Sequence, residues 1–435
     1  MPNNDNHNFI TKQEHDETYR VKKVSNFVSD GDGNLVREGI NKPIQAADSP
    51  SIDAFGRWRV SQVETIFDSK QVFDTLPLLY DDQEVSGSGT GSTHNPNHAA
   101  TEMTVSASTA GKRVRQSFMR MNYQPGKSQL ILCTGTLGGG GTGITAAMGY
   151  FDDNDGLFAQ SKDGVAYFVK RSNYTGTPVD TEVAQADWNI DTFDGNGPSG
   201  ITLDPTKSQI LFIDFEWLGV GRVRMGWVVD GLIYYCHEFL HSNNQAGVYM
   251  STPNLPIRYE IENDGTGGAA ELEHICASVM SEGGVQNNGY LRHQDSGLVS
   301  SLSSGTAYAI MGGRLKSTHL GASVLVENLS LIGSANDQCH WELRIGSTVA
   351  GTFTYSDIAN SAVQVATGSN ANTVTGGTEI DGGYFSTSQG IQFSVPNALK
   401  LGADISGTPQ EWQLVVIPVT NNMSIRASVT WRELL

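Results

Sequence analysis

The sequence predicts an all-β protein with two β-sandwich or jelly-roll domains, preceded by an extended N-terminal arm. At 435 residues the chain is longer than a single hydrophobic core usually serves. Its 49 Gly residues, together with Ser, Thr, Asn and Asp, fill the segments between apolar runs, as expected where many short strands need many turns. The runs themselves alternate apolar and polar residues, which indicates strands with one buried face.

The predicted arm covers residues 1–50, which are polar and charged and contain few residues that could form a core. Such a composition is typical of a disordered tail. It is equally typical of an arm that becomes ordered only against neighbouring subunits, and the sequence leaves both alternatives open. No basic stretch followed by an apolar core is found near the N-terminus, so we expect that the chain has no secretory signal. We therefore expect the protein to be made in a cytoplasm.

The first sandwich is expected over residues 51–285 as a jelly roll, and segment 53–74 within it is rich in aromatic residues. Its four large aromatic residues are Phe55, Trp58, Phe67 and Phe73. Aromatic side chains beside a polar arm are suited to fill a groove on a partner, where a few such residues provide most of the binding energy. We predict that the four form an assembly anchor. For Trp58 and Phe67 a place in the core of the first sandwich is the alternative.

The clearest strands of this domain are LFIDFEW and RVRMGWVV. In LFIDFEW the apolar residues share one face, while Asp214 and Glu216 share the other. Asp230-Gly231 follows the second run and predicts a tight hairpin turn, because both residues tolerate a positive φ. The apolar residues of AAELEHICASVM fit a helix or a strand equally well.

Residues 286–305 are rich in Gly, Asn and Ser and are predicted to be a linker. The C-terminal sandwich is expected over residues 306–435. Its clearest strand is the last one, in which Met423, Ile425, Ala427, Val429 and Trp431 alternate with polar residues.

The charge balance and the cysteines exclude several classes of function. With 28 Lys and Arg against 46 Asp and Glu, the formal charge is -18, which disfavours binding to nucleic acid or to an anionic membrane. No apolar run is long enough to span a bilayer. Cys133, Cys236, Cys276 and Cys339 lie far apart, so we expect buried free thiols.

One motif matches that of zinc metalloproteases: His237-Glu238-Phe239-Leu240-His241 has the form HExxH. That chemistry requires a helix, since only a helix brings residues i and i+4 together on one metal ion. Here the motif ends a run that is typical of a hairpin strand, where four residues span about 13 Å. We therefore expect no zinc at this motif.

The remaining candidate sites are weaker. Asp30, Asp32 and Asn34 begin an EF-hand-like loop, but Leu35 occupies the position where such a loop requires Gly. The acids of FDDNDG are typical of an ordinary turn. Three tryptophans could line a sugar site, although core positions are the usual place for strand tryptophans; they are Trp188, Trp217 and Trp227. Whether two carboxylates form a glycosidase pair depends on the fold. We predict no enzyme, with no catalytic residue, no metal and no cofactor.

Several long segments resemble a family of virion structural proteins of tailed bacteriophages. These segments are DAFGRWRVSQVETIFDSKQ, YQPGKSQ, DWNIDTFDGNGPSGITLDPTKSQ, FIDFEWLGVGRVRMGWVVDG and YMSTPNLPIRYEI. The resemblance covers roughly residues 50–285 and implies a virion component, on the capsid or the tail. Separately, the strand-Asp-Gly-strand pattern is similar to that of concanavalin-like and laminin-G-like jelly rolls, an analogy of fold alone.

Two functions remain at this stage. The first is a non-enzymatic virion protein, assembled in the host cytoplasm, that forms a homotrimer and binds other virion proteins as a decoration, collar or fibre component. The second is a tail protein that binds or degrades host-surface polysaccharide. Under this second function, host-surface glycans are an expected binding partner. The acidic balance, the Gly-rich loops and the missing catalytic set favour the first.

Overall fold

The computed structural model describes residues 27–29, 35–37, 52–59, 62–138, 140–334, 338–386 and 389–434. The chain divides into two compact units, Met1–Val60 and Ser61–Leu435. In the first unit, β1 (Phe27–Ser29) pairs antiparallel with β2 (Leu35–Arg37). The rest of the predicted arm lies outside the described residues, as do Asp30, Asp32 and Asn34 of the EF-hand-like loop.

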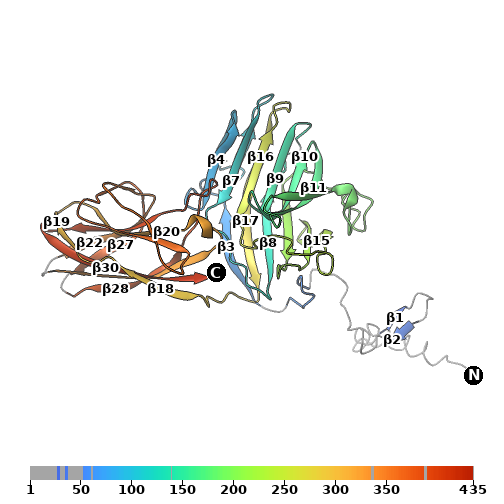
Figure 1. Ribbon diagram of the computed structural model, residues 1–435. Helices are drawn as coiled ribbons and strands as arrows, with labels where there is room; N and C mark the ends of the chain where they lie inside the picture. The colour runs from blue at the N-terminus through green and yellow to red at the C-terminus, as the bar shows by residue number, and fades with distance from the viewer. Residues whose placement is uncertain are drawn as a thin grey trace, which may run out of the picture. The chain divides into compact units, whose positions relative to one another are not determined.

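The second unit is all-β, and its sheets form two sandwiches, as the sequence predicts. In the first sandwich, a seven-stranded antiparallel sheet packs against an eight-stranded one (Figure 1). The seven-stranded sheet has the order β12 (Val179–Ala184), β11 (Val165–Ser172), β10 (Gly156–Lys162), β9 (Ile144–Phe151), β16 (Ile257–Asn263), β7 (Gly111–Ser117) and β4 (Tyr80–Gly87). The eight-stranded sheet has the order β15 (Leu232–Phe239), β14 (Val223–Val229), β13 (Gln209–Phe215), β8 (Ser128–Gly135), β17 (Ala270–Glu282), β6 (Ala100–Val105) and β5 (Thr90–Asn95), with β3 (Val63–Lys70) also paired to β17.

Consecutive strands of this sandwich cross repeatedly between its two sheets. β7, β9 and β16 belong to the seven-stranded sheet, whereas β8 and β17, which follow β7 and β16 in the chain, belong to the eight-stranded sheet. Such crossings give the connectivity of a jelly roll. The alternation of LFIDFEW is confirmed on one face, because Leu211, Ile213 and Phe215 are all fully buried in the core between the sheets.

The alternation of apolar and polar residues suggested that the opposite face of these strands is polar and solvated, but it is buried in part. Asp214 and Arg224 lie on it, yet both side chains are fully buried and form an ion pair with each other. Ser128 donates a hydrogen bond of 2.7 Å to Asp214, and the Arg224 guanidinium lies 4.3 Å from the centre of the Tyr235 ring. Polar residues on this face therefore take part in packing.

The hairpin predicted at Asp230-Gly231 is confirmed. The two residues have φ values of 52° and 79° and connect β14 directly to β15. Positive φ at both positions matches the right-handed twist of the two strands, which is why Asp-Gly is favoured there.

The second sandwich pairs a five-stranded with a six-stranded sheet. The five-stranded sheet has the order β18 (Tyr290–Asp295), β30 (Met423–Leu434), β21 (Ser323–Gly333) and β28 (Ile391–Lys400), with β19 (Val299–Leu302) also paired to β30. The six-stranded sheet has the order β24 (Ser356–Asp357), β25 (Val363–Thr367), β20 (Tyr308–Leu315), β29 (Trp412–Pro418), β22 (Gln338–Ile345) and β27 (Thr378–Ser386). A small ladder joins β23 (Thr348–Val349) to β26 (Val374–Thr375).

The core of the second sandwich is separate from that of the first. The apolar residues of the last predicted strand all belong to it, so the alternation from Met423 to Trp431 is confirmed. The Trp431 ring is buried, and its Nε1 atom donates a hydrogen bond of 2.7 Å to Glu433. The polar atom of this buried ring is therefore satisfied within the second core.

One segment differs from its prediction, and the structure decides between the two alternatives for another. Residues 286–305, predicted as a linker, contain β18 and β19, and both strands pair with β30 of the second sandwich. Their polar composition reflects exposure of one face at a sheet edge. The ambiguous segment AAELEHICASVM forms β17, which is held between β6, β3 and β8.

Helices are almost missing from the described residues. They comprise two short 3₁₀ turns, η1 (Gln185–Asp187) and η2 (Ser317–His319). Within this part of the chain, no helix has the length and apolar character needed to cross a membrane. All four cysteines are free, as predicted; Cys133, Cys236 and Cys339 are buried, whereas Cys276 is only partly buried.

Candidate functional site

The predicted anchor residues Phe55 and Trp58 belong to the unit that ends at Val60. The side chain of Asp53 accepts hydrogen bonds of 2.8 Å from the backbone N–H and from Nε of Arg57, which closes a tight turn. Arg57 in turn lies 4.6 Å from the centre of the half-buried Phe55 ring. Trp58 follows this turn and is 65% exposed. The turn therefore presents Trp58 at the surface of its unit.

The other two anchor residues lie in opposite environments. Phe67, on β3, is buried in the first core and packs edge-on against Tyr80, with ring centroids 6.0 Å apart. Phe73, in the loop after β3, is 86% exposed. Of these two predicted anchor residues, Phe73 alone is available to a partner, and Phe67 takes the core position that the sequence left open.

The base of the loop that carries Phe73 is fixed by a buried guanidinium. Arg115 on β7 is buried, and it donates hydrogen bonds to Gln71, to the carbonyl oxygen of Thr75, to Asp82 and to Nδ1 of His274. Gln71 and Thr75 lie on either side of Phe73 in the chain. The exposed ring is therefore held on a loop anchored at both ends.

This network also fixes the protonation of His274. Its Nδ1 atom accepts the N–H of Arg115 at 3.2 Å, so the ring is neutral. Complete burial, together with the charge of Arg115, lowers the pKa of His274 well below its usual value. The ring stacks on Tyr259, with centroids 3.9 Å apart, as part of the core.

The HExxH motif lies on and just after strand β15, as predicted, and each imidazole has a protein partner. Nδ1 of His237 accepts the backbone N–H of Asn189 at 3.2 Å, and Nδ1 of His241 donates to the carbonyl oxygen of Gly221 at 2.6 Å. The Phe239 ring contacts both imidazoles, at centroid distances of 4.6 and 6.5 Å. Burial lowers the pKa of each histidine to about 4, so both rings are neutral near pH 7.

The acids of FDDNDG build a turn, as predicted. Asp152 accepts the backbone N–H groups of Asn154 and Asp155 at 2.8 and 2.9 Å and pairs with Arg120 at 2.5 Å. Burial disfavours the charged form, but Arg120 and the two N–H groups outweigh it and lower the pKa of Asp152. The carboxylate of Asp155 accepts hydrogen bonds from Ser251, at 2.7 Å to its backbone N–H, and thereby connects distant loops. These carboxylates are structural.

The three tryptophans considered for a sugar site take part in the first core. Trp188 stacks on Phe168 with centroids 4.2 Å apart, and Trp227 is fully buried. Trp217 packs against the same core and donates from Nε1 to the carbonyl oxygen of Met250 at 3.1 Å. The rings of Trp188 and Trp227 are therefore closed to a sugar, and Trp217 is partly buried against the core.

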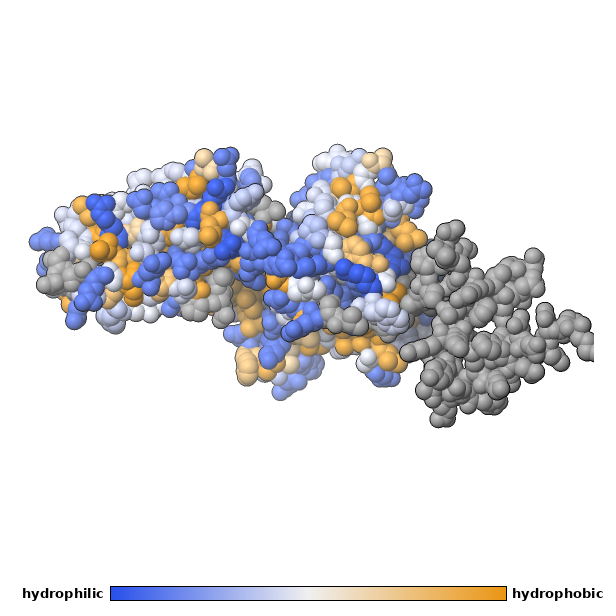
Figure 2. Space-filling view, turned by 90° about the horizontal axis from the view of Figure 1, so that it is seen from below, coloured by the Kyte–Doolittle hydropathy of each residue, from blue (hydrophilic) through white to orange (hydrophobic). Residues whose placement is uncertain are grey.

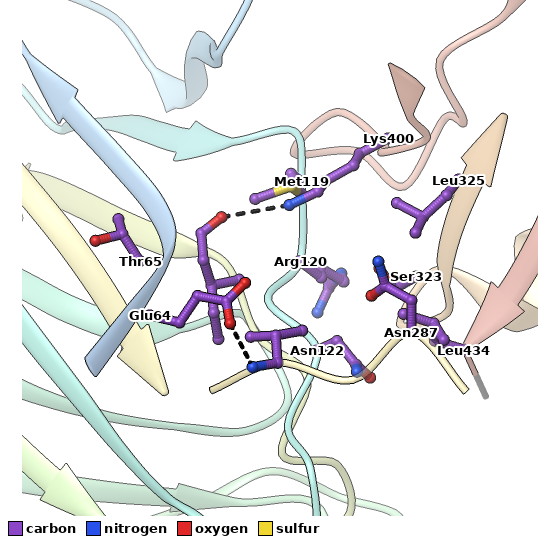
Figure 3. A pocket seen from close by; sticks show the side chains of 12 residues that line it. Glu64, Thr65, Met119, Arg120, Asn122, Asn287, Ser323, Leu325, Lys400 and Leu434 are labelled. Carbon is purple, nitrogen blue, oxygen red and sulfur yellow. Dashed lines mark hydrogen bonds between the residues drawn. The ribbon is translucent and has the colours of Figure 1, made fainter. Parts of the chain in front are cut away.

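A pocket of about 310 Å³ lies between strands of the two sandwiches within the second unit (Figure 3). Glu64 reaches it from β3, and Lys400 reaches it from β28. Glu64 accepts the backbone N–H of Val285 at 2.6 Å, and Lys400 donates to the carbonyl oxygen of Ile66 at 3.3 Å. Loss of water around the ammonium group lowers the pKa of Lys400. Both charged groups thus bind main-chain atoms across the pocket.

The surface offers no large continuous apolar area in the view of Figure 2, where hydrophobic surface is divided into patches by hydrophilic side chains. Within the described residues, the loop after β3 gathers several exposed apolar side chains. They are Val72, Phe73, Leu78 and Leu79. Of these, Phe73 is the most exposed, so the loop is the candidate contact surface of the first sandwich.

No family model and no curated protein sequence matches the chain. Among solved structures, the β-glucanase of Bacillus licheniformis is 11% identical, with 50% of this chain and 99% of that chain covered and a TM-score of 0.34. The carbohydrate recognition domain of Emp47p is 10% identical over 50% of this chain and 96% of that chain, with a TM-score of 0.31. The CBM2 module of the evolved Dit protein of Lactobacillus casei BL23 phage J-1 is 8% identical over 52% and 99%, with a TM-score of 0.33. At scores this low, none of them bears on what this chain does.

Phe67 and Phe73 provide a matched pair for separating core from surface. We expect Phe67→Ala to lower the free energy of unfolding by about 3–5 kcal/mol, since it leaves a cavity in the first core. Phe73→Ala should change it by less than about 0.5 kcal/mol, because the ring is in water. Urea unfolding followed by tryptophan fluorescence measures both. Equal losses in the two variants would contradict the assignment.

The buried neutral histidines predict a loss of stability in acid. Because the unfolded chain takes up protons near pH 6.5 and the folded His237 and His241 only near pH 4, stability is full above about pH 6.5 and falls as the pH drops towards 4. For each imidazole, the free energy of unfolding falls by up to about 3 kcal/mol over this pH range. The measurement is urea unfolding at pH 7, 6 and 5.

The His241 ring stacks on Tyr249 with ring centroids 4.1 Å apart. A His241→Phe variant keeps an aromatic ring at this place but removes the titrating imidazole. Its unfolding free energy should therefore depend less steeply on pH than that of the unaltered protein. The exposed His319 serves as the control, and His319→Asn should leave the slope unchanged. An unaltered slope in His241→Phe would show that this ring does not titrate on unfolding.

Proposed function

We propose that this protein is a non-enzymatic structural component of a tailed-bacteriophage virion, which assembles through exposed aromatic residues and presents its sandwiches outward. The observation that carries this proposal is the 86% exposure of Phe73 on a loop fixed at both ends by Arg115. Burial of such a ring in a partner is worth about 1.5–3 kcal/mol. Because the loop is already held in place, little conformational entropy is lost on binding.

The sequence supports the virion assignment through the long segments that resemble tailed-phage structural proteins. A non-enzymatic role is supported by the bonding of the candidate catalytic groups. Among the described residues, the acids of FDDNDG pair with cations or cap turns, and both histidines of HExxH are bonded to main-chain atoms. Groups engaged in this way serve the fold.

The proposed partners are copies of the same chain, arranged as a homotrimer, and other virion proteins. Closed symmetry allows one adhesive surface to be satisfied by copies of itself without open-ended aggregation. The acidic balance, with a formal charge of -18, is compatible with solubility at high copy number before assembly in the host cytoplasm. Both a capsid and a tail location agree with this proposal.

Replacing the two exposed anchor residues should impair assembly without unfolding the protein. We expect Trp58→Ser and Phe73→Ser each to lower the amount of protein incorporated into particles, because each ring fills a groove on a partner. In the double variant the amount should fall at least tenfold. Incorporation is measured by quantitative immunoblotting of purified particles after complementation in trans.

Tyr384, which is 72% exposed in the second sandwich, provides the matched control. Tyr384→Ser should enter particles normally. Normal incorporation of the Trp58 and Phe73 double variant, at unchanged thermal stability, would rule out the anchor. Immunogold labelling of the same particles distinguishes a capsid from a tail location.

Binding of host saccharide is a second candidate function, favoured by one pocket of the second sandwich. This pocket, of about 370 Å³, is lined by Phe353 and Tyr355 together with the ion pair of Arg314 and Glu411. Aromatic rings beside charged hydrogen-bonding groups are suited to a sugar ring.

A glycan array tests this second function. Binding that is lost in Phe353→Ala and Glu411→Gln but retained in Trp58→Ser would support a saccharide site in the second sandwich. An array without any signal above background, obtained with folded protein, would remove this candidate and leave the assembly role unaffected.

A further inference from the structure

A histidine and two glutamates converge on the outer side of the eight-stranded sheet. His98 lies in the turn that joins β5 to β6, Glu102 lies on β6, and Glu273 lies on β17. Nδ1 of His98 is 2.6 Å from a carboxylate oxygen of Glu273 and 3.5 Å from one of Glu102. One ligand atom from each residue lies within 4.8 Å of the others. Two distant segments of the chain, the β5–β6 turn with the start of β6 and strand β17, therefore direct donor atoms to one point.

The strand register places two negative charges directly opposite each other at this point. Glu102 and Glu273 are cross-strand partners in the antiparallel pair of β6 and β17. Like charges in that position destabilise a sheet. Among the described residues, the ion pairs of these two carboxylates are with His98 and with no Lys or Arg. Glu271 adds a further carboxylate two residues along the same face of β17. The register thus favours a bound cation beyond the imidazole.

The geometry suits a small metal ion. Two ligand atoms about 2.1 Å from a tetrahedral ion lie about 3.4 Å apart, and His98 and Glu102 are already at 3.5 Å. The pair of His98 and Glu273 has to open by less than an ångström. Both carboxylates are held on strands, and their side chains are only 22% and 13% exposed, so little ordering remains for the ion to impose.

The donor set indicates the class of ion. An imidazole nitrogen with two carboxylate oxygens is suited to Zn²⁺ and other divalent first-row transition metals, whereas Ca²⁺ and Mg²⁺ prefer sites made of oxygen alone. We propose that His98, Glu102 and Glu273 bind one such ion, with water completing its coordination, and that the ion ties the β5–β6 turn to β17. The metal site does not rest on the proposed assembly function.

Isothermal titration of the full chain with ZnCl₂, after removal of bound metal with EDTA and exhaustive dialysis into chelator-free buffer, tests the proposal. We expect one Zn²⁺ per chain and an affinity lowered at least tenfold in His98→Ala and in Glu273→Gln. Adding Zn²⁺ should raise the thermal midpoint of the unaltered protein more than that of either of these two variants. His98 is 57% exposed at its side chain, so its removal should leave the circular dichroism spectrum unchanged. His319→Ala is the matched control and should bind Zn²⁺ normally.

Three outcomes would overturn the site. The first is equal Zn²⁺ affinity in the unaltered protein and in both variants. The second is Zn²⁺ binding that survives in His98→Ala but disappears in His237→Ala, which would place the metal at the HExxH segment. The third is a preference for Ca²⁺ over Zn²⁺ that is unchanged in His98→Ala. That result would show that ions bind to the acidic surface without an imidazole ligand.

Discussion

A buried positive charge imposes the constraint on which the candidate contact surface depends. Arg115 lies inside the first sandwich, where an unpaired guanidinium would cost several kcal/mol. It is satisfied by donating to Asp82 on β4, to His274 on β17 and to Gln71 and Thr75 in the loop after β3. One side chain thereby connects both sheets to that loop. The exposure of Phe73 is a consequence, since the loop cannot fold inward without breaking these bonds.

The buried polar groups of the first sandwich show why a polar residue within this fold is not by itself a sign of chemistry. His274 accepts a hydrogen bond from Arg115 and is held neutral, and Asp214 and Arg224 neutralise each other on the outer face of the eight-stranded sheet. Such groups have perturbed environments because two large sheets must bury their faces, and buried charges need partners. A binding site has to be sought where several donor atoms converge at a partly exposed point, as they do at His98.

Much of the fold follows from local patterns in the sequence. Alternation predicted the inward faces of β13 and β30, and Asp230-Gly231 predicted a turn, because both depend on residues close together in the chain. The patterns failed where pairing is distant. The residues of β17 fit a helix or a strand until its pairing with β6, β8 and β3 is considered. The segment of β18 and β19 has the composition of a linker, because the strand that pairs with both, β30, lies more than a hundred residues later.

Single residues show the same limit. Phe67 and Phe73 look alike in the sequence, and their separation into core and surface depends on where β3 ends against β17. The group of His98, Glu102 and Glu273 was missed altogether. His98 and Glu273 are 175 positions apart, and no short motif contains both. Only the register of β6 on β17 brings them together, and register across a sheet is set by the whole hydrophobic pattern rather than by local spacing.

Strand β17 therefore has a double role in the first sandwich. Its first half pairs with β6 and carries Glu273, while its second half pairs with β3, the strand that leads into the loop of Phe73. His274 lies between the two halves and binds Arg115. Because the pairing of both halves is fixed by one continuous strand of 13 residues, a change that shifts its register would displace the carboxylates and the exposed aromatic loop together. An ion held between His98, Glu102 and Glu273 would fasten the register of β6 on β17, and through β17 it would stabilise the strand that positions the contact loop.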